Sequence, residues 1–245
     1  MTLFPHARVD EFTHLIDLAG IRAGDRIYDI PSGGGYLRNF IPGDTHLCGV
    51  ETSAGFYALS EAQPPDEKVL CEDLGHIPLP SSSAHKVLSL AGLHHLEDKT
   101  PFYREAARLL AEGGALCVAD VLEGSPPARF LNDFLDKHSS MGHRGLFITE
   151  GEIRQEIESA GFAVEYINPT SFVWKFPSLD GMVSFMRLLL GIDKADGATI
   201  LKAIDDILGY EKVGDSYHMS WGLLYLRAVS AQRSQPAVLQ NGADQ

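Results

Sequence analysis

Hydrophobic positions in the first half of the chain fall into short apolar runs separated by amphipathic stretches. Near the N-terminus, Phe12, Leu15 and Ile16 lie at helical spacing and Gly20 follows as a C-cap, which predicts a helix over about residues 9–18. The apolar runs that come next have the length and composition of strands. They read DRIYDI, THLCGVE, EKVLCEDL, HKVLSLA and GALCVADVL.

Amphipathic segments separate these runs and predict helices over about residues 55–62 and 100–110, the second of which is stopped by Gly113 and Gly114. Strands that are apolar nearly throughout and alternate with helices indicate a parallel sheet covered on both faces. Because crossovers in such sheets are right-handed, the leading prediction is an α/β, Rossmann-like doubly wound fold.

The pattern changes after Leu122. The runs ARFLNDFLDKHSS and TEGEIRQEIESAGF predict helices, the second with Thr149 as its N-cap, while AVEYINPTSFVWKF and YHMSWGLLYLRAV predict two further strands. We therefore expect a mostly parallel sheet of seven strands. Two helices predicted within residues 178–209 form a helical insertion before the last strand, and they cover either a ligand or only the protein's own core.

Three consecutive glycines follow the first predicted strand, in the stretch YDIPSGGGYL. A glycine-rich turn in this position lets backbone N–H groups approach a ligand at the start of the next helix. Asp29 stands directly before the turn, where its carboxylate would repel a pyrophosphate and would suit an ammonium group. The third glycine of the dinucleotide fingerprint G-x-G-x-x-G is also missing. The turn therefore favours a cationic amino-acid ligand over a nucleotide phosphate.

These residues resemble the first motif of the class I S-adenosylmethionine-dependent methyltransferases of the small-molecule type. That motif has the form D-x-G-x-G-x-G, and IYDIPSGGGYL matches it with Pro31 in place of the first glycine. The stretches GVETS, CEDLGHIPLP and VLSLAGLHHLEDKTPFYREAARLLAEGGALCVAD resemble later parts of the family in the same order. The resemblance implies a Rossmann-like methyltransferase core, with S-adenosyl-L-methionine as cofactor and S-adenosyl-L-homocysteine as product.

The resemblance divides the chain into parts of one methyltransferase domain, residues 1–245. We expect an N-terminal helical segment over residues 1–25 and a cofactor-binding core over residues 26–122. A substrate-side half over residues 123–230 contains the helical insertion, and the polar residues 231–245 form a flexible tail.

The resemblance also implies which residues hold the nucleoside part of the cofactor. Glu51, about 22 residues after Asp29, would accept hydrogen bonds from both ribose hydroxyls. Asp73 would accept from the adenine amine, although its neighbour Glu72 could take that role. Leu74 would contribute its backbone N–H and an apolar contact to the adenine.

At the end of the fourth predicted strand, Leu90 and Ala91 would line the methionine end of the cofactor. Ser89 would take this place if the register differed by one residue. The full set of expected cofactor-binding residues is Asp29, Ser32, Gly33, Gly34, Gly35, Glu51, Thr52, Asp73, Leu74, Leu90 and Ala91.

Methyl transfer from a sulfonium is an in-line displacement with a neutral leaving group, so positioning supplies most of the acceleration. A general base is needed only for a weakly acidic O–H, N–H or C–H acceptor. The catalytic candidates are His94, just after the fourth predicted strand, and His143, in the loop GHRGLF. Each of them is alternatively a packing or surface histidine.

Candidate substrate-binding residues lie in the second half of the chain. Phe134 and Trp174 could form walls of an acceptor pocket, although aromatic residues at such spacings are also typical of a core. Arg187 in the predicted insertion could hold a carboxylate acceptor. The acids and histidines have no metal-ligand spacing, so we expect no metal site.

Composition and charge limit the class of partner. The formal net charge is −13 and no basic cluster is present, which argues against nucleic acids and anionic membranes as partners. Cys48, Cys71 and Cys117 are far apart in apolar runs and read as buried thiols in a reducing compartment. We expect no secretory signal, a cytoplasmic location, a small-molecule substrate, and a monomer or homodimer.

Together these features predict S-adenosylmethionine-dependent methyl transfer to a small molecule, by O-, N- or C-methylation or by carboxyl methyl ester formation. The alternative is a regulatory or partner protein that binds S-adenosylmethionine without catalysis. A nicotinamide dehydrogenase is a more distant alternative because Asp29 precedes the glycine turn.

Overall fold

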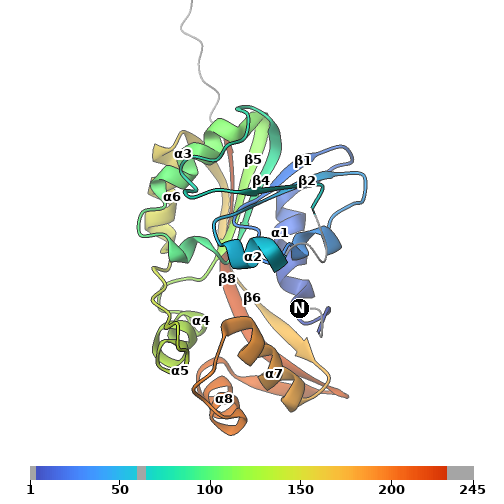
Figure 1. The fold of residues 1–245 in the computed structure, drawn as a ribbon, viewed down its shortest axis with the longest axis vertical. Helices are drawn as coiled ribbons and strands as arrows, with labels where there is room; N and C mark the ends of the chain where they lie inside the picture. The colour runs from blue at the N-terminus through green and yellow to red at the C-terminus, as the bar shows by residue number, and fades with distance from the viewer. Residues whose placement is uncertain (1–3, 60–64, 231–245) are drawn as a thin grey trace, which may run out of the picture.

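The computed structural model describes residues 4–59 and 65–230. It contains one mixed sheet with the strand order β3-β2-β1-β4-β5-β8-β6, and β7 pairs with β8 beside this path (Figure 1). The predicted tail and the end of the helix predicted over residues 55–62 lie outside the described residues. The strands are β1 Arg26–Asp29, β2 His46–Glu51, β3 Glu67–Leu70, β4 Ala84–Leu90, β5 Leu110–Asp120, β6 Phe162–Phe176, β7 Tyr210–Val213 and β8 Ser216–Ser230.

The first five strands pair in parallel, as their nearly continuous apolar sequences predict. The long strands β6 and β8 pair antiparallel with each other, and β8 pairs antiparallel with β5. The mostly parallel, Rossmann-like sheet is therefore confirmed. β7, which the sequence pattern did not predict, adds a short strand to the outer part of β8.

Helices cover both faces of the sheet, and the sheet separates two hydrophobic cores. The helix α1 Val9–Ala19 packs on one face through Phe12 and Leu15. The helices α3 Thr100–Leu109 and α6 Glu150–Ser159 pack on the other face through residues such as Phe102 and Ile153. Figure 1 shows α1 on one side of the strands and α3 with α6 on the opposite side. Thr149 caps α6 as predicted, because its side chain accepts from the N–H of Glu152.

Gly113 and Gly114 do not end α3, contrary to the prediction from the sequence pattern. α3 ends at Leu109, and β5 begins at once with Leu110. Gly113 and Gly114 lie inside β5, where the register against β4 shifts between Ala84 and Lys86. Gly113 has φ 74°, so the glycine permits a bulge in the strand rather than ending a helix.

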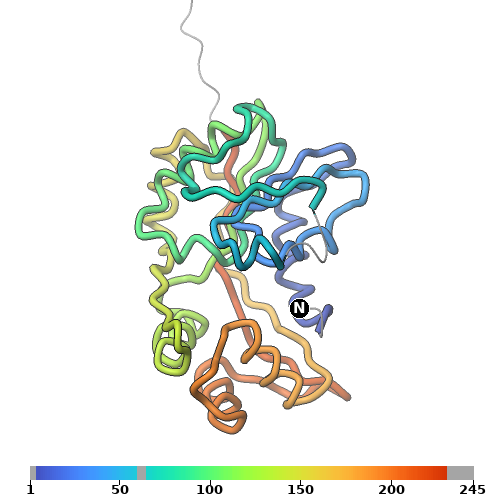
Figure 2. Tube along the Cα trace, in the orientation of Figure 1, coloured from blue at the N-terminus to red at the C-terminus, as the bar shows by residue number. Residues whose placement is uncertain are grey.

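The outer half of the molecule is built on β6 and β8, which extend beyond the parallel strands (Figures 1 and 2). The connection between them carries α7 Leu179–Leu190, α8 Gly197–Ala203 and the π-helical segment η5 Ile204–Leu208. After β5, α4 Pro126–Arg129, the π-helical segment η4 Phe130–Leu135 and α5 Asp136–His138 follow one another. These helices lie at the carboxyl ends of the parallel strands, where α/β sheets bind their ligands.

Candidate active site

The glycine turn after β1 is fixed by its own backbone. Gly33 and Gly35 have φ values of 52° and 72°, a left-handed conformation that glycine adopts without steric cost. The N–H of Ser32 donates to the carbonyl of Val50 on β2 at 2.8 Å. The turn leads only into the short 3₁₀ segment η1 Tyr36–Asn39. The expectation of a helix start here was wrong, so the N–H groups offered to a ligand belong to the turn itself.

Two buried acids flank this turn. Glu51 ends β2, and its Oε2 accepts from the N–H of Gly33 at 2.8 Å, while Oε1 accepts from the N–H groups of Thr52 and Ser53 at 2.8 and 2.9 Å. Asp29 ends β1 with 6% of its surface exposed, and its carboxylate has no hydrogen-bond or ion-pair partner among the described residues. Burial, and then the nearby Glu51 carboxylate, raise the pKa of Asp29 to about 8. An ammonium group at this place would restore the ionised form.

Asp73 and Leu74 lie in the loop that follows the carboxyl end of β3. Asp73 is exposed, and its Oδ1 accepts from the N–H of Gly75 at 2.8 Å while Oδ2 lies 3.0 Å from Nδ1 of His76. The hydrogen bond with His76 is the main cause that lowers the pKa of Asp73. Leu74 is buried, whereas Glu72 is exposed.

The end of β4 supports the predicted register. Leu90 is the last residue of β4 and is partly buried, whereas the Ser89 side chain is fully buried within the sheet. Ala91 has φ 50°, and its N–H donates to the carbonyl of Ala119 on β5 at 2.7 Å. Leu90 and Ala91, rather than Ser89, therefore stand at the carboxyl edge of the sheet.

His94 is held by a buried carboxylate that the sequence analysis did not single out. Nδ1 of His94 lies 2.6 Å from Oδ1 of Asp120, the last residue of β5. Oδ2 of Asp120 accepts from the N–H groups of Leu93 and His94 at 2.8 and 3.2 Å. Burial acts to raise the pKa of Asp120, but the charge and hydrogen bond of His94 and two backbone N–H groups lower it. An acid that ends an apolar strand next to a histidine loop was the available signal for Asp120.

His143 lies beside the same loop. The ring centroids of His94 and His143 are 5.5 Å apart, and those of His95 and His143 are 5.4 Å apart. The N–H of Leu146 donates to the carbonyl of His94 at 2.8 Å, which fixes the two loops together. Burial, followed by the charges of His94 and His95, lowers the pKa of His143 to about 4. The structure thus brings both catalytic candidates together, and it adds His95.

The predicted substrate residues lie elsewhere. Trp174 is 2% exposed and donates its indole N–H to Oε2 of Glu11, so it belongs to the core around α1. Phe134 is buried in η4 and stacks on His138 with centroids 4.3 Å apart. Arg187 is partly buried in the last turn of α7. None of the three lines the cavity described next.

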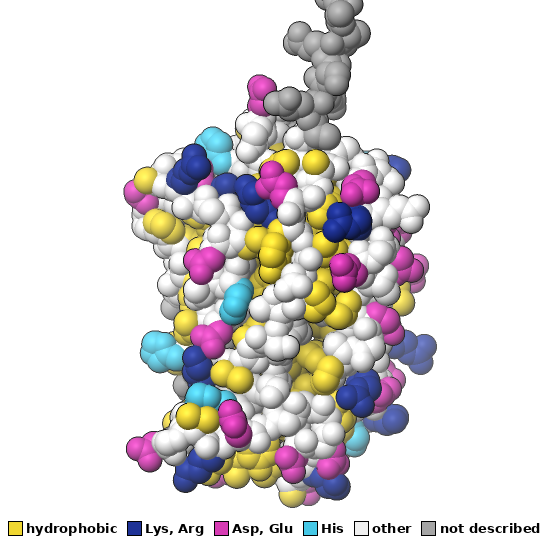
Figure 3. Space-filling view, turned by 180° about the vertical axis from the view of Figure 1, so that it is seen from behind, with side chains coloured by type: hydrophobic (Ala, Val, Ile, Leu, Met, Phe, Trp, Pro, Cys, Tyr) yellow, Lys and Arg dark blue, Asp and Glu magenta, His cyan; other side chains and the backbone are white. Residues whose placement is uncertain are grey.

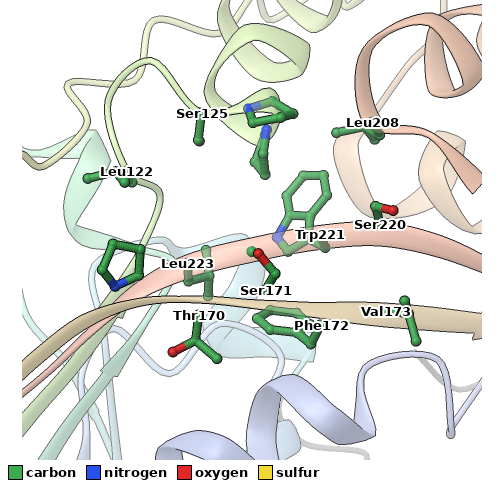
Figure 4. Close-up of a pocket in the computed structure, with 14 residues that line it drawn as sticks. Leu122, Ser125, Thr170, Ser171, Phe172, Val173, Leu208, Ser220, Trp221 and Leu223 are labelled. Carbon is green, nitrogen blue, oxygen red and sulfur yellow. The ribbon is translucent and has the colours of Figure 1, made fainter.

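An apolar cavity of about 450 Å³ lies between α4, η5 and the extended strands β6 and β8 (Figure 4). Trp221 points from β8 into this space, toward the elements that carry Ser125 and Leu208. Leu122, two residues after Asp120, also lines the cavity. Aromatic residues at strand spacing in β8 were the sequence signal for this wall. The remaining lining comes from Pro126, Pro127, Pro169, Thr170, Ser171, Phe172, Val173, Ser220, Gly222 and Leu223.

The surface shows no single-sign patch on the face drawn in Figure 3, where acidic and basic side chains are interspersed around exposed hydrophobic ones. In residues 4–59 and 65–230, no helix has the length and apolar character needed to cross a bilayer. Cys48, Cys71 and Cys117 are buried free thiols, as predicted.

Comparison with known proteins agrees with this geometry. A family model described as a methyltransferase domain matches residues 28–118. The 27-O-demethylrifamycin SV methyltransferase of Amycolatopsis mediterranei (strain S699) is 34% identical over 128 residues, which cover 47% of this chain and 47% of that relative. The match thus spans about half the length of this curated relative.

Solved structures share the fold at low identity. A protein described as a candidate methyltransferase from Bacillus halodurans C-125 has a TM-score of 0.65 at 15% identity, covering 91% of this chain and 99% of that chain. Phosphoethanolamine N-methyltransferase 2 of Haemonchus contortus, in complex with S-adenosyl-L-methionine, has a TM-score of 0.61 at 15% identity, covering 94% of this chain and 57% of that one. Asp29 beside the glycine turn is buried and has no partner in the described part of the chain, so its carboxylate fits the ammonium group of such a cofactor. Residues 28–118 are therefore similar to a methyltransferase domain, and the described fold is shared with a solved S-adenosyl-L-methionine complex.

Proposed function

We propose that this protein transfers a methyl group from S-adenosyl-L-methionine to an oxygen, nitrogen or carbon atom, or to a carboxylate, of a small molecule. The observation that carries the proposal is the carboxylate of Asp29, which is buried where a glycine turn and Glu51 meet and has no partner in residues 4–59 and 65–230. A buried charge of this kind is costly unless a ligand of opposite charge completes the site.

Residues at the ends of three strands would each bind a different part of the cofactor. Asp29 would bind the ammonium group and the turn at Gly33–Gly35 would offer backbone N–H groups to the methionine part. Glu51 would accept from the ribose hydroxyls with the lone pairs that its three backbone N–H partners leave free. Asp73 and Leu74 would contact the adenine, and Ser32, Gly34, Thr52, Leu90 and Ala91 would complete the lining.

When bound, the cofactor supplies an electrophilic methyl group on a sulfonium. The protein's own contribution is to align the acceptor with that group and to exclude water, which can supply on the order of 7–11 kcal/mol. The cavity lined by Trp221 and Leu122 has the size and apolar character of a small-molecule site. The name of the rifamycin methyltransferase also supports a small-molecule acceptor.

His94 is the best-placed proton acceptor at this edge of the sheet. Asp120 accepts the Nδ1 proton of His94, so the lone pair of Nε2 is free to face an acceptor at the carboxyl edge of the sheet. His143, with its low pKa, is neutral at physiological pH and is the second candidate. The acidic composition supports the absence of nucleic-acid and anionic membrane partners, and the free thiols support a cytoplasmic location. We further propose that the protein acts as a monomer or homodimer.

The first experiment is a calorimetric titration with S-adenosyl-L-methionine, S-adenosyl-L-homocysteine and NAD, repeated on Asp29→Ala and Glu51→Ala. Binding of both sulfur compounds, lost in both variants and absent for NAD, is the expected result. Acceptor screening with labelled cofactor then separates an enzyme from a binding protein without catalysis. Wild-type protein that binds neither sulfur compound would refute the proposal.

A further inference from the structure

Three imidazoles from two separate segments meet at the carboxyl edge of the sheet. One ring nitrogen from each of His94, His95 and His143 lies within 4.8 Å of the others. His94 and His95 belong to the 3₁₀ segment η3 Leu93–His95 after β4, and His143 lies in the loop before α6. Sequence spacing alone could not reveal this cluster, because its histidines come from two segments that are far apart in the chain.

The partners of two of these rings fix which nitrogen carries the proton. The carboxylate of Asp120 accepts from three backbone N–H groups, so Nδ1 of His94 donates to it at 2.6 Å. The amide of Asn132 is oriented by Gly145, whose N–H donates to Oδ1 at 2.8 Å and whose carbonyl accepts from Nδ2 at 2.9 Å. Nδ1 of His143, 3.1 Å from the same Oδ1, is therefore also a donor. In both rings the lone pair is left on Nε2.

This arrangement is the one found around metal-binding histidines. A ligating histidine usually donates its other N–H to a carboxylate or carbonyl oxygen, which orients the ring and makes it a stronger ligand. Asp120 and Asn132 serve two of the three rings in this way. Asn132 lies in η4, a π-helical segment inside an otherwise α-helical stretch, and such segments often mark functional sites.

We propose that His94, His95 and His143 bind a divalent transition metal ion of the Zn²⁺ type, with one coordination position left open. Three neutral imidazoles are a known ligand set for Zn²⁺ in catalytic sites that keep a fourth position for water or substrate. Tetrahedral bonds of about 2.0–2.1 Å would bring the nitrogens to roughly 3.4 Å from one another, which rotation of the rings can provide. His95 is exposed and His143 half-buried, so the ion can enter from solvent.

The same observations distinguish the cluster from ordinary packing. Packing alone does not require that Nδ1 in two rings from separate segments be held by polar side chains while one nitrogen of each ring lies within 4.8 Å of the others. Two of the rings come from adjacent residues of η3 and the third comes from the loop before α6, so the fold rather than the local sequence brings their nitrogens together.

If the proposed methyl transfer holds, the hydroxyl group of the methyl acceptor would bind the metal ion at its open coordination position. Coordination would lower the pKa of that hydroxyl, which gives its proton to solvent. The acceptor oxygen then forms the new O–CH₃ bond as the S–CH₃ bond breaks, and the thioether leaves with the electron pair. With the metal ion bound, Nε2 of His94 would be a metal ligand, so His94 could no longer act as the general base.

The test is a calorimetric titration of untagged, chelator-treated protein with Zn²⁺, followed by the visible spectrum of the Co²⁺-loaded protein. We expect saturation at about one ion per chain and a tetrahedral Co²⁺ spectrum. His95→Ala and His143→Ala should each weaken binding by at least about tenfold. His14→Ala, which removes an exposed histidine of α1, should leave binding unchanged.

The positioning role of Asn132 has its own variants. Asn132→Leu removes the acceptor for His143 and should weaken Zn²⁺ binding about 10–100-fold, whereas Asn132→Asp keeps an acceptor and should restore much of it. Titration of each sample with S-adenosyl-L-homocysteine keeps the two claims separate. Cofactor binding without Zn²⁺ binding, or Zn²⁺ binding that His95→Ala and His143→Ala leave unchanged, would overturn the metal site and leave the proposed function standing.

Discussion

The backbone N–H of Gly33 donates a hydrogen bond of 2.8 Å to Oε2 of Glu51. This bond ties the glycine turn after β1 to the acid at the end of β2 before any cofactor is present. Glu51 also accepts from two further backbone N–H groups, so all three hydrogen bonds of its carboxylate come from backbone donors.

Glu51→Gln is therefore not a neutral change. The amide would place its NH₂ group against backbone donors, and a buried donor without an acceptor costs about 1–3 kcal/mol. We expect at least a tenfold loss of affinity for S-adenosyl-L-homocysteine and a lower melting temperature. Calorimetry and thermal unfolding measure the two effects, with the exposed Glu112→Gln as the matched control. Equal affinities of the two variants would argue against a role of Glu51 in the cofactor site.

The raised pKa of Asp29 predicts a pH-dependent cofactor affinity. The folded protein without cofactor holds the Asp29 proton up to a pH of about 8, whereas the unfolded chain loses it near pH 4. A bound ammonium group needs the ionised carboxylate. The affinity for S-adenosyl-L-homocysteine should thus rise by up to about tenfold per pH unit from pH 6 to pH 8, with a proton released on binding.

The Asp29 proton also determines whether the free energy of unfolding rises or falls with pH. Between about pH 4 and pH 8 the folded state binds one more proton than the unfolded state, so the free energy of unfolding of the cofactor-free protein falls as the pH rises. Asp29→Asn should flatten both pH dependences and weaken binding at pH 8. The exposed Glu112→Gln should behave as the wild type, and a wild-type affinity that does not change with pH would count against the raised pKa.

Sequence reasoning predicted the elements that have a strong periodicity. The predicted runs became β1 to β6 and β8, and the continuous apolar sequences of β1, β2, β4 and β5 suit strands buried on both faces. β7 was missed because YEKV has one exposed face and pairs only with the outer end of β8. The short η1 was also missed, since nothing in YLRN marks where a helix fails to continue.

The candidate site divides in the same way. Asp29, Glu51 and Leu90 are the last residues of their strands. The strand pattern alone could therefore place them at one edge of the sheet. Asp120 and Asn132 act through side chains that reach residues distant in sequence. Trp174 illustrates the opposite error, since its partner Glu11 lies on α1, and no periodicity reveals that pairing.

Gly92 supports the turn from the neighbouring loop. A Cβ added at Gly92 would lie 2.4 Å from Cγ and 2.9 Å from Cδ of Pro31, which comes directly before Ser32 and the glycine turn. The backbone at Gly92, with φ −138°, would itself accept an alanine, so the effect of Gly92→Ala is crowding alone. We expect a loss of stability of about 1–3 kcal/mol and weaker binding of S-adenosyl-L-homocysteine.

Denaturant unfolding and calorimetry on Gly92→Ala test this contact. Gly151→Ala is the matched control, because a Cβ there meets nothing within 4 Å and the residue lies in α6, where alanine is favoured over glycine. Its stability should be unchanged or higher. Wild-type stability and cofactor affinity in Gly92→Ala would mean that Pro31 moves without disturbing the turn.

Glu11 anchors α1 to the outer half of the sheet. Its fully buried carboxylate pairs with Arg8 and accepts the indole N–H of Trp174 at 2.9 Å. Glu11→Ala would leave the Arg8 guanidinium and the Trp174 N–H without an acceptor in the core, which should lower the free energy of unfolding by about 3–5 kcal/mol. Arg154→Ala breaks the exposed pair with Glu158 and should change it by less than about 1 kcal/mol. Urea unfolding of both variants measures the difference, and similar losses would show that Arg8 finds another partner or water when Glu11 is removed.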